Sequence, residues 1–229
     1  MDDPSQQSGG KGSGVDLEEV WRQREEEVYP ALFGAVSRGI FPLSQDVFAP
    51  FGDVKVDPRW ITHGVFEFAP TDERPSWLYV TSGYFNPWED APEDIAADGP
   101  SGAGVEFILE TDRQGDWAIR CLQKLLAYEL CMASGQVGSG TPLGLNDRIP
   151  LGGPITGEAG HTIEAVMIVM PTNVSEGFDL PSGDVMLVQF AGLTDAERAH
   201  ASNVGVDSLL QHLKATEFPV TVPDRASVV

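Results

Sequence analysis

The stretch Asp98–Glu110, DGPSGAGVEFILE, joins a loop rich in glycine and proline to a run of mostly apolar residues. A glycine-rich loop that binds phosphate is followed by a helix, whose first backbone N–H groups face the anion. Here the residues after the first glycines, GVEFILET, predict a strand instead. The stretch also lacks the Lys-Ser/Thr pair of a P-loop. The sequence therefore argues against a phosphate site and predicts a turn that leads into a strand.

The other reactive side chains do not predict an enzyme. Ser101 misses the G-x-S-x-G pattern of a nucleophile elbow by one residue and no helix follows it, so we expect it to form part of the turn. The sequence contains no H-E-x-x-H motif, and we expect His161 to be an exposed single histidine. The acidic run Trp88–Asp94, WEDAPED, lacks the spacing of an EF-hand loop. It is interpreted as a solvated loop, or alternatively as a weak contact for a cation or a partner. We expect no catalytic residues, no metal and no cofactor.

The chain is strongly acidic. Its 229 residues include 35 acidic and 14 basic side chains, which gives a formal net charge of −21. Without a basic stripe, neither a nucleic-acid backbone nor an anionic membrane surface is an expected partner. The acidity has two interpretations: it keeps the protein soluble, or it favours a basic protein partner.

The composition also predicts a cytoplasmic protein. The longest apolar run, Ala165–Met170, is far shorter than the ~20 residues of a membrane span. The first residues contain no apolar segment typical of a signal peptide. Cys121 and Cys131 fall in one predicted helix, about 15 Å apart at the helical rise per residue. This distance is too long for a disulfide, so we expect two reduced thiols in a reducing compartment.

The hydrophobic pattern predicts one domain over residues 15–222, between a disordered tail, 1–14, and a flexible C-terminal tail, 223–229. We expect helices from Asp16 to Val36, where Pro30 kinks or divides the helix, at 115–134, and at 194–215, where Thr194 and Glu197 form a capping box. Strands are expected at residues 61–70, 76–85, 104–111, 162–171 and 183–193, with an edge strand at 218–223. These interleaved elements predict an α+β fold, with a mixed β-sheet packed with helices as an α/β sandwich.

Several motifs resemble those of the Suppressor of fused family, and they follow one another along the chain in the family's order. The family pattern D-G-P-S-G-x-G-x-E leads directly into a strand, and all its fixed positions are present: Asp98, Gly99, Pro100, Ser101, Gly102, Gly104 and Glu106. Upstream, Trp77–Gly83 is similar to the family's W-x-Y-[IV]-[ST]-x-G strand. Downstream, residues 126–128, 141–143 and 188–197 are similar to a helix segment, a Ser-Pro-Leu segment and a strand-to-helix turn. The resemblance covers residues 60–215.

The resemblance implies a non-enzymatic, protein-binding domain of mixed α/β fold. In the animal family member this domain is the N-terminal half of a clamp, in which a short peptide from a Gli-type transcription factor adds as a strand. The position of Asp98 faces that peptide, so Asp98 is implied as a partner-binding residue, and the rest of the motif as a structural turn. Asp98 has a second interpretation, because aspartate before Gly-Pro often caps its own turn by accepting bonds from backbone N–H groups.

The sequence departs from the animal protein because it lacks the second half of the clamp. It resembles the short, stand-alone bacterial members, and this resemblance implies an immunity protein, which binds and neutralises a toxin, as one role. We therefore expect a protein partner, and a basic toxin or basic peptide strand fits the acidic chain. The alternatives are a structural or assembly subunit and a hydrolase without a recognisable motif.

Overall fold

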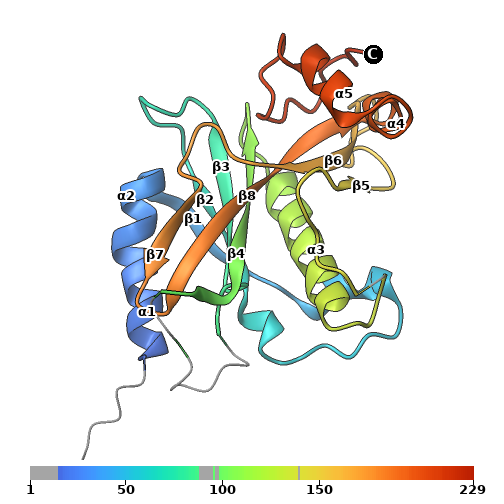
Figure 1. Ribbon diagram of the computed structural model, residues 1–229. Helices are drawn as coiled ribbons and strands as arrows, with labels where there is room; N and C mark the ends of the chain where they lie inside the picture. The colour runs from blue at the N-terminus through green and yellow to red at the C-terminus, as the bar shows by residue number, and fades with distance from the viewer. Residues whose placement is uncertain (1–14, 88–94, 96–97, 139) are drawn as a thin grey trace, which may run out of the picture.

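The computed structural model describes residues 15–87, 95, 98–138 and 140–229, so the predicted tail 1–14 and the acidic run 88–94 lie outside the described residues. One mixed sheet of eight strands carries helices on both faces, which confirms the predicted α+β fold (Figure 1). The strands are β1 (Val36–Pro42), β2 (Gly64–Phe68), β3 (Trp77–Ser82), β4 (Pro100–Thr111), β5 (Arg148–Pro150), β6 (Ile163–Val169), β7 (Gly177–Leu180) and β8 (Gly183–Thr194). The helices are α1 (Leu17–Gln23), η1 (Arg24–Val28), α2 (Tyr29–Phe33), η2 (Gln45–Phe51), η3 (Trp60–Thr62), α3 (Asp116–Ala133), α4 (Asp195–Asn203) and α5 (Val206–Leu213).

The two longest strands, β4 and β8, form the centre of the sheet. The order is β1-β2-β3-β4-β8-β6-β5, and β7 pairs with the first part of β8. β4 and β8 run parallel, whereas the other pairs of described strands are antiparallel. The strand that follows the glycine-rich stretch is therefore flanked by a strand on each side.

The N-terminal helix packs on one face of the sheet. α1 passes through the π-helical turn η1 into α2, and Pro30 lies in the first turn of α2, where its missing N–H removes a helical bond. The helix ends at Gly34, which has a φ of 88°. The prediction that it extends to Val36 is wrong, because Val36 begins β1.

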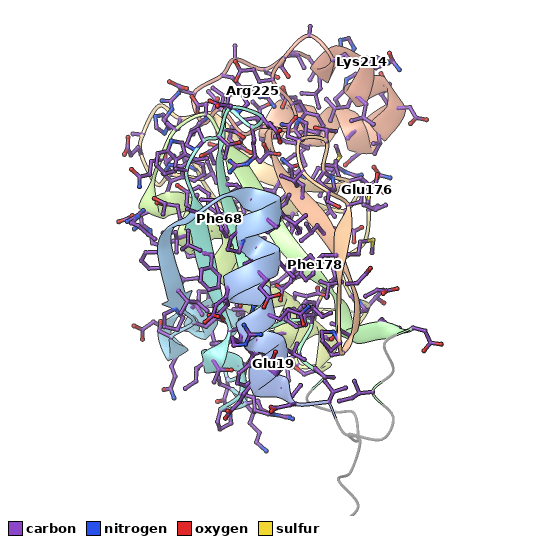
Figure 2. All side chains as sticks on the ribbon, turned by 90° about the vertical axis from the view of Figure 1, so that its left-hand side faces the viewer. Glu19, Phe68, Glu176, Phe178, Lys214 and Arg225 are labelled. Atoms are coloured by element: carbon purple, nitrogen blue, oxygen red, sulfur yellow. The ribbon has the colours of Figure 1, made fainter. Side chains whose placement is uncertain are left out.

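Aromatic side chains fix this helix to the sheet. Tyr29 is fully buried, and its ring centroid lies 6.0 Å from that of Phe68 on β2 and 5.8 Å from that of Phe178 on β7. Figure 2 faces the helix, with Phe68 and Phe178 on either side of it. Burial of each such side chain contributes roughly 1.5–3 kcal/mol to the free energy of unfolding.

The helix α3 covers the opposite face (Figure 1). Leu122 and Leu126 are fully buried there, in the same core cluster as Phe107 of β4 and Phe190 of β8, whose ring centroids are 5.0 Å apart. The observed bounds, Asp116–Ala133, agree with the predicted helix within one residue at each end. Cys121 and Cys131 are both buried in α3 and are not joined by a disulfide.

The last helical region begins as predicted and then divides. In the capping box, the Thr194 N–H donates to Glu197 Oε2 at 2.9 Å, and the Glu197 N–H donates to Thr194 Oγ1 at 3.2 Å. One helix through residue 215 was predicted, but the helix is interrupted at Gly205, where φ is 126°. This backbone conformation is not helical, so two short helices, α4 and α5, form instead of one.

The C-terminal residues also differ from expectation. Residues 218–223 make only an isolated bridge, from Thr221 to Thr111, because their prolines supply no N–H to a ladder. Residues 223–229, which were predicted to be a flexible tail, make contacts with the domain. Arg225 donates to Glu197 at 2.7 Å, and the Val228 N–H donates to the same buried carboxylate at 3.1 Å. A charged side chain that ends in a buried ion pair anchors the segment.

Candidate functional site

Asp98 lies at the surface, two residues before β4 begins. Its side chain is exposed, and its carboxylate has no hydrogen-bond partner among the described residues. A turn-capping aspartate accepts a bond from a backbone N–H, and no such bond to Asp98 occurs in this part of the chain. The carboxylate is therefore open to solvent.

Ser101 and Gly102 contact the connection between β3 and β4. Ser101 is fully buried, and its Oγ lies 3.2 Å from the carbonyl oxygen of Phe85 and 2.7 Å from the Oγ of Ser182. Gly102 has a φ of 52°, and a Cβ at this position would lie 2.4 Å from the Phe85 carbonyl oxygen. Only glycine allows the two backbones to approach this closely. Ser101 and Gly102 thus fix the start of the β3–β4 connection, at Phe85.

Glu106 fixes the same connection from within the sheet. Its Oε1 accepts bonds from the N–H groups of Gly83, at 2.7 Å, and Phe85, at 3.4 Å, and its Oε2 accepts a bond from the hydroxyl of Thr81. Complete burial raises the pKa of Glu106, and these hydrogen bonds and the charge of Arg24 only partly oppose that rise. Glu106 therefore serves as a buried acceptor for the end of β3.

The other motif residues shape an irregular start of β4. The Gly99 carbonyl accepts a bond from the Asp184 N–H at 2.8 Å, and Pro100 pairs with Asp184. The next aligned pair is Val105 with Met186, so β4 has more residues than β8 between these two pairs. Gly104, with a φ of 65°, lies inside the bulge. The predicted simple turn is therefore a bulged first part of the strand, because the positive φ values of Gly102 and Gly104 bend the chain between the pair at Asp184 and the pair at Met186.

Exposed carboxylates gather beside Asp98. Asp179 of β7 lies directly opposite Asp184 of β8, and Asp184 is in turn opposite Pro100 at the start of β4. Neighbouring strands are about 4.8 Å apart, so these carboxylates and that of Asp98 lie at one end of the sheet. We call Asp98, Asp179 and Asp184 the acidic edge; all three are exposed.

The acidic edge has no compensating cation among the described residues, because none of its three carboxylates forms an ion pair with any of them. Like charges directly opposite each other in a strand pair are destabilising, so the pair Asp179–Asp184 reduces the stability of the β7–β8 hairpin. Met186, two residues after Asp184 and on the same face of β8, is 47% exposed. The site thus combines negative charge with an accessible apolar side chain.

The strand β7 also leaves one backbone edge open. It pairs only with β8, and no described strand lies on its other side. Figure 2 shows Phe178 of β7 beside the N-terminal helix. An unpaired edge presents backbone N–H and C=O groups that another strand can bind.

Comparison with known proteins identifies the family. The family model described as Suppressor of fused protein (SUFU) matches residues 59–226. The chain belongs to the SUFU family. The resemblance seen in the sequence, over residues 60–215, is thereby confirmed; the match begins one residue earlier and extends further, to residue 226. No curated protein matches the sequence.

Three solved SUFU structures share the fold. A chain of the Sufu–Fu complex is 18% identical with a TM-score of 0.61, and the match covers 93% of this chain and 90% of that one. A SUFU homologue from Neisseria gonorrhoeae is 16% identical with a TM-score of 0.58, over 93% and 92% of the two chains. Drosophila Suppressor of Fused is 19% identical with a TM-score of 0.55, over 72% of this chain and 42% of that one. The match therefore spans less than half of the Drosophila chain.

The sequence did not single out the residues that surround the SUFU motif. The indole N–H of Trp21 donates to Asn86 Oδ1 at 2.9 Å, and the Arg24 guanidinium lies 5.3 Å from the ring centroid of Phe85. The sequence did contain a signal for Arg24, because an arginine within the apolar stripe of a helix is expected to be buried, and a buried guanidinium needs partners. For Asp179 and Asp184 the register of the hairpin was required, and the sequence alone does not provide it.

The described residues contain no group of three or more histidine, cysteine, aspartate or glutamate side chains that could hold a metal ion. His161 was predicted to be exposed, but it is half-buried, and its Nδ1 is 2.6 Å from the Oγ1 of Thr156. Within the same residues, the helices are too short or too polar to cross a membrane.

Proposed function

We propose that this SUFU-family chain is a non-enzymatic module that binds a basic segment of a protein partner at the acidic edge. The observation that carries the proposal is the cross-strand pair Asp179–Asp184, next to Asp98, without a cation among the described residues. Such a pair costs stability in the free protein. A partner that supplies cations removes this repulsion, so the two carboxylates are more stable in the complex than in the free protein.

The open edge of β7 suggests how the partner binds. An extended segment can pair with β7, so that its backbone supplies affinity while lysine or arginine at alternate positions meets Asp179, Asp184 and Asp98. The net charge of −21 attracts a basic partner over a longer range and speeds the encounter.

The biological role that fits best is that of an immunity protein, which neutralises a basic toxin in the cytoplasm. Three observations support this role. One matched SUFU structure is of a complex, between Sufu and Fu. The surface charge suits a basic target. The two cysteines, buried and not joined to each other, fit a reducing compartment.

The test is charge reversal at Asp98 with a matched control. Binding is measured to a short synthetic peptide with lysine at alternate positions, to its glutamate counterpart, and to the protein that co-purifies from native cells. We expect Asp98→Lys to weaken binding of the lysine peptide and the native partner by about tenfold or more, with an unchanged melting temperature. Asp53→Lys makes the same charge change at an exposed position outside the acidic edge and should bind like the wild type.

Two results contradict the proposal. If Asp98→Lys and Asp53→Lys weaken binding equally, net charge and not the acidic edge determines affinity. If Asp98→Lys unfolds the domain, Asp98 has a structural role, and Asp184→Lys then tests the edge independently. A native complex that contains only copies of this chain would favour an assembly subunit.

A further inference from the structure

A cavity of about 520 Å³ lies along α3 and shares no residue with the acidic edge. One side is formed by Phe51 at the end of η2, the other by residues 149–157, and the floor by α3. Its volume falls within the range of sites that hold a small molecule. One side belongs to η2 and the other to β5 and the loop that follows it, so a ligand in the cavity contacts three separate segments of the chain.

The interior of the cavity is apolar. Trp117, Cys121 and Leu125 follow each other at four-residue steps on one side of α3 and are almost fully buried, and Ile155 faces them across the cavity. Burial raises the pKa of the Cys121 thiol to about 12, so this side chain is neutral and also apolar in character at neutral pH. The cavity therefore favours a hydrocarbon or aromatic group.

Two cations line the same cavity. Arg120 and Lys124 are exposed and lie four residues apart on α3, so their Cα atoms are about 6 Å apart. Neither side chain forms a hydrogen bond or an ion pair with a described residue. Each of the other described arginines forms at least one such bond, as Arg22 and Arg113 do to carboxylates. In a chain of charge −21, two free cations beside an apolar cavity select an anion.

We infer that this cavity binds a monomeric amphipathic carboxylate of the fatty-acid class, with its hydrocarbon chain against Trp117 and Leu125 and its carboxylate between Arg120 and Lys124. A carboxylate accepts hydrogen bonds from both cations, and such charge-assisted bonds are stronger than neutral ones. A polyanion or an anionic membrane is disfavoured, because the rest of the surface is acidic and repels it. The inference does not depend on the proposed partner.

The test uses dodecanoate as the probe, below its micelle concentration. Binding is measured by calorimetry, and the indole N–H signal of Trp117 is followed by NMR after assignment with Trp117→Phe. We expect saturable binding that shifts the Trp117 signal and leaves those of Trp21 and Trp77, which do not line the cavity, unchanged. Dodecanol, which has the same chain without the charge, should bind about tenfold more weakly. Acetate, which has the charge without the chain, should not bind.

Paired variants separate the two cations from general charge effects. Arg120→Ala/Lys124→Ala should raise the dissociation constant of dodecanoate by roughly fivefold to tenfold and leave that of dodecanol unchanged. Lys55→Ala/Lys214→Ala removes the same charge from exposed positions outside the cavity and should bind dodecanoate like the wild type. The inference is overturned if dodecanoate does not bind, if Trp117 does not respond, or if both double variants behave alike.

Discussion

At the residue scale, the buried carboxylates Glu197 and Glu106 differ in the charge of their hydrogen-bond partners. Glu197 has a cation, Arg225, and the bonds from this arginine and from backbone N–H groups outweigh the effect of burial and hold its pKa below the usual range. Glu106 has neutral donors as its partners, so burial dominates and raises its pKa. A carboxyl group with a raised pKa is destabilising in its charged form, yet its oxygens satisfy N–H groups that have no other acceptor.

We expect Glu106→Ala to destabilise the protein by about 3–5 kcal/mol, because it leaves the buried N–H groups of Gly83 and Phe85 unsatisfied and opens a cavity. Glu106→Gln keeps the size and one acceptor oxygen and should cost less than about 1.5 kcal/mol. Urea unfolding measures both changes. Equal losses for the two variants would show that the negative charge, and not the acceptor, matters.

The same pair of proteins tests the pKa of Glu106. Because its pKa in the folded state lies above the ordinary value of 4.5, the folded protein keeps a proton that the unfolded chain releases. The resulting stabilisation is present below the unfolded pKa and is lost as pH rises through the folded pKa. As pH rises above the ordinary value of 4.5, Glu106→Gln should lose less stability than the wild type. Parallel profiles would contradict a raised pKa.

At the element scale, the bulged start of β4 depends on close backbone contact. Gly102 combines a positive φ with a Cβ position 2.4 Å from the Phe85 carbonyl oxygen. Gly135, just after α3, also has a positive φ, 71°, but a Cβ there would meet nothing within 4 Å. The two glycines therefore separate the cost of backbone conformation from the cost of a steric clash.

We expect Gly135→Ala to destabilise the protein by roughly 1 kcal/mol, the cost of a left-handed conformation for a residue with a Cβ. Gly102→Ala should cost about 1–3 kcal/mol more, because the added methyl displaces the β3–β4 connection. Thermal unfolding of both variants measures the difference. If the two losses are equal, the connection moves freely and the SUFU motif does not fix it.

Elements with strong local signals were predicted from the sequence. The long amphipathic helix α3, the capping box at Thr194 and the strand β4 carry their own patterns, and all are present. The short strands β5 and β7 were not predicted, because so few residues give no periodicity and depend on their partners. Asp98 was proposed as a partner-binding residue from a sequence motif, and that remains a prediction. Asp179 was not proposed, because its position opposite Asp184 is set by the β7–β8 register.

At the scale of the whole molecule, a charge of −21 implies self-repulsion in the folded state. Added salt screens this repulsion, because the Debye length falls from about 30 Å at about 0.01 M to about 8 Å at about 0.15 M. Salt also weakens the exposed ion pairs, such as that of Arg22 with Glu19, but each of these contributes little.

We therefore expect the melting temperature to rise by a few degrees as sodium chloride increases from about 0.01 M to about 0.15 M. Calorimetry measures this shift. Sodium perchlorate at the same ionic strength serves as the control, because simple screening predicts a rise with either salt. A fall in both salts would show that exposed ion pairs outweigh the self-repulsion.

The parallel pair β4–β8 has a consequence for synthesis on the ribosome. β4 must wait for β8, which follows it by roughly eighty residues, so at 5–20 residues per second the delay is about 4–16 s. During that time the apolar strand β4 has a neighbour, β3, on one side only. The nascent chain therefore exposes an unpaired apolar strand edge during synthesis, and a chaperone that covers extended apolar segments would protect it until the last third of the domain emerges.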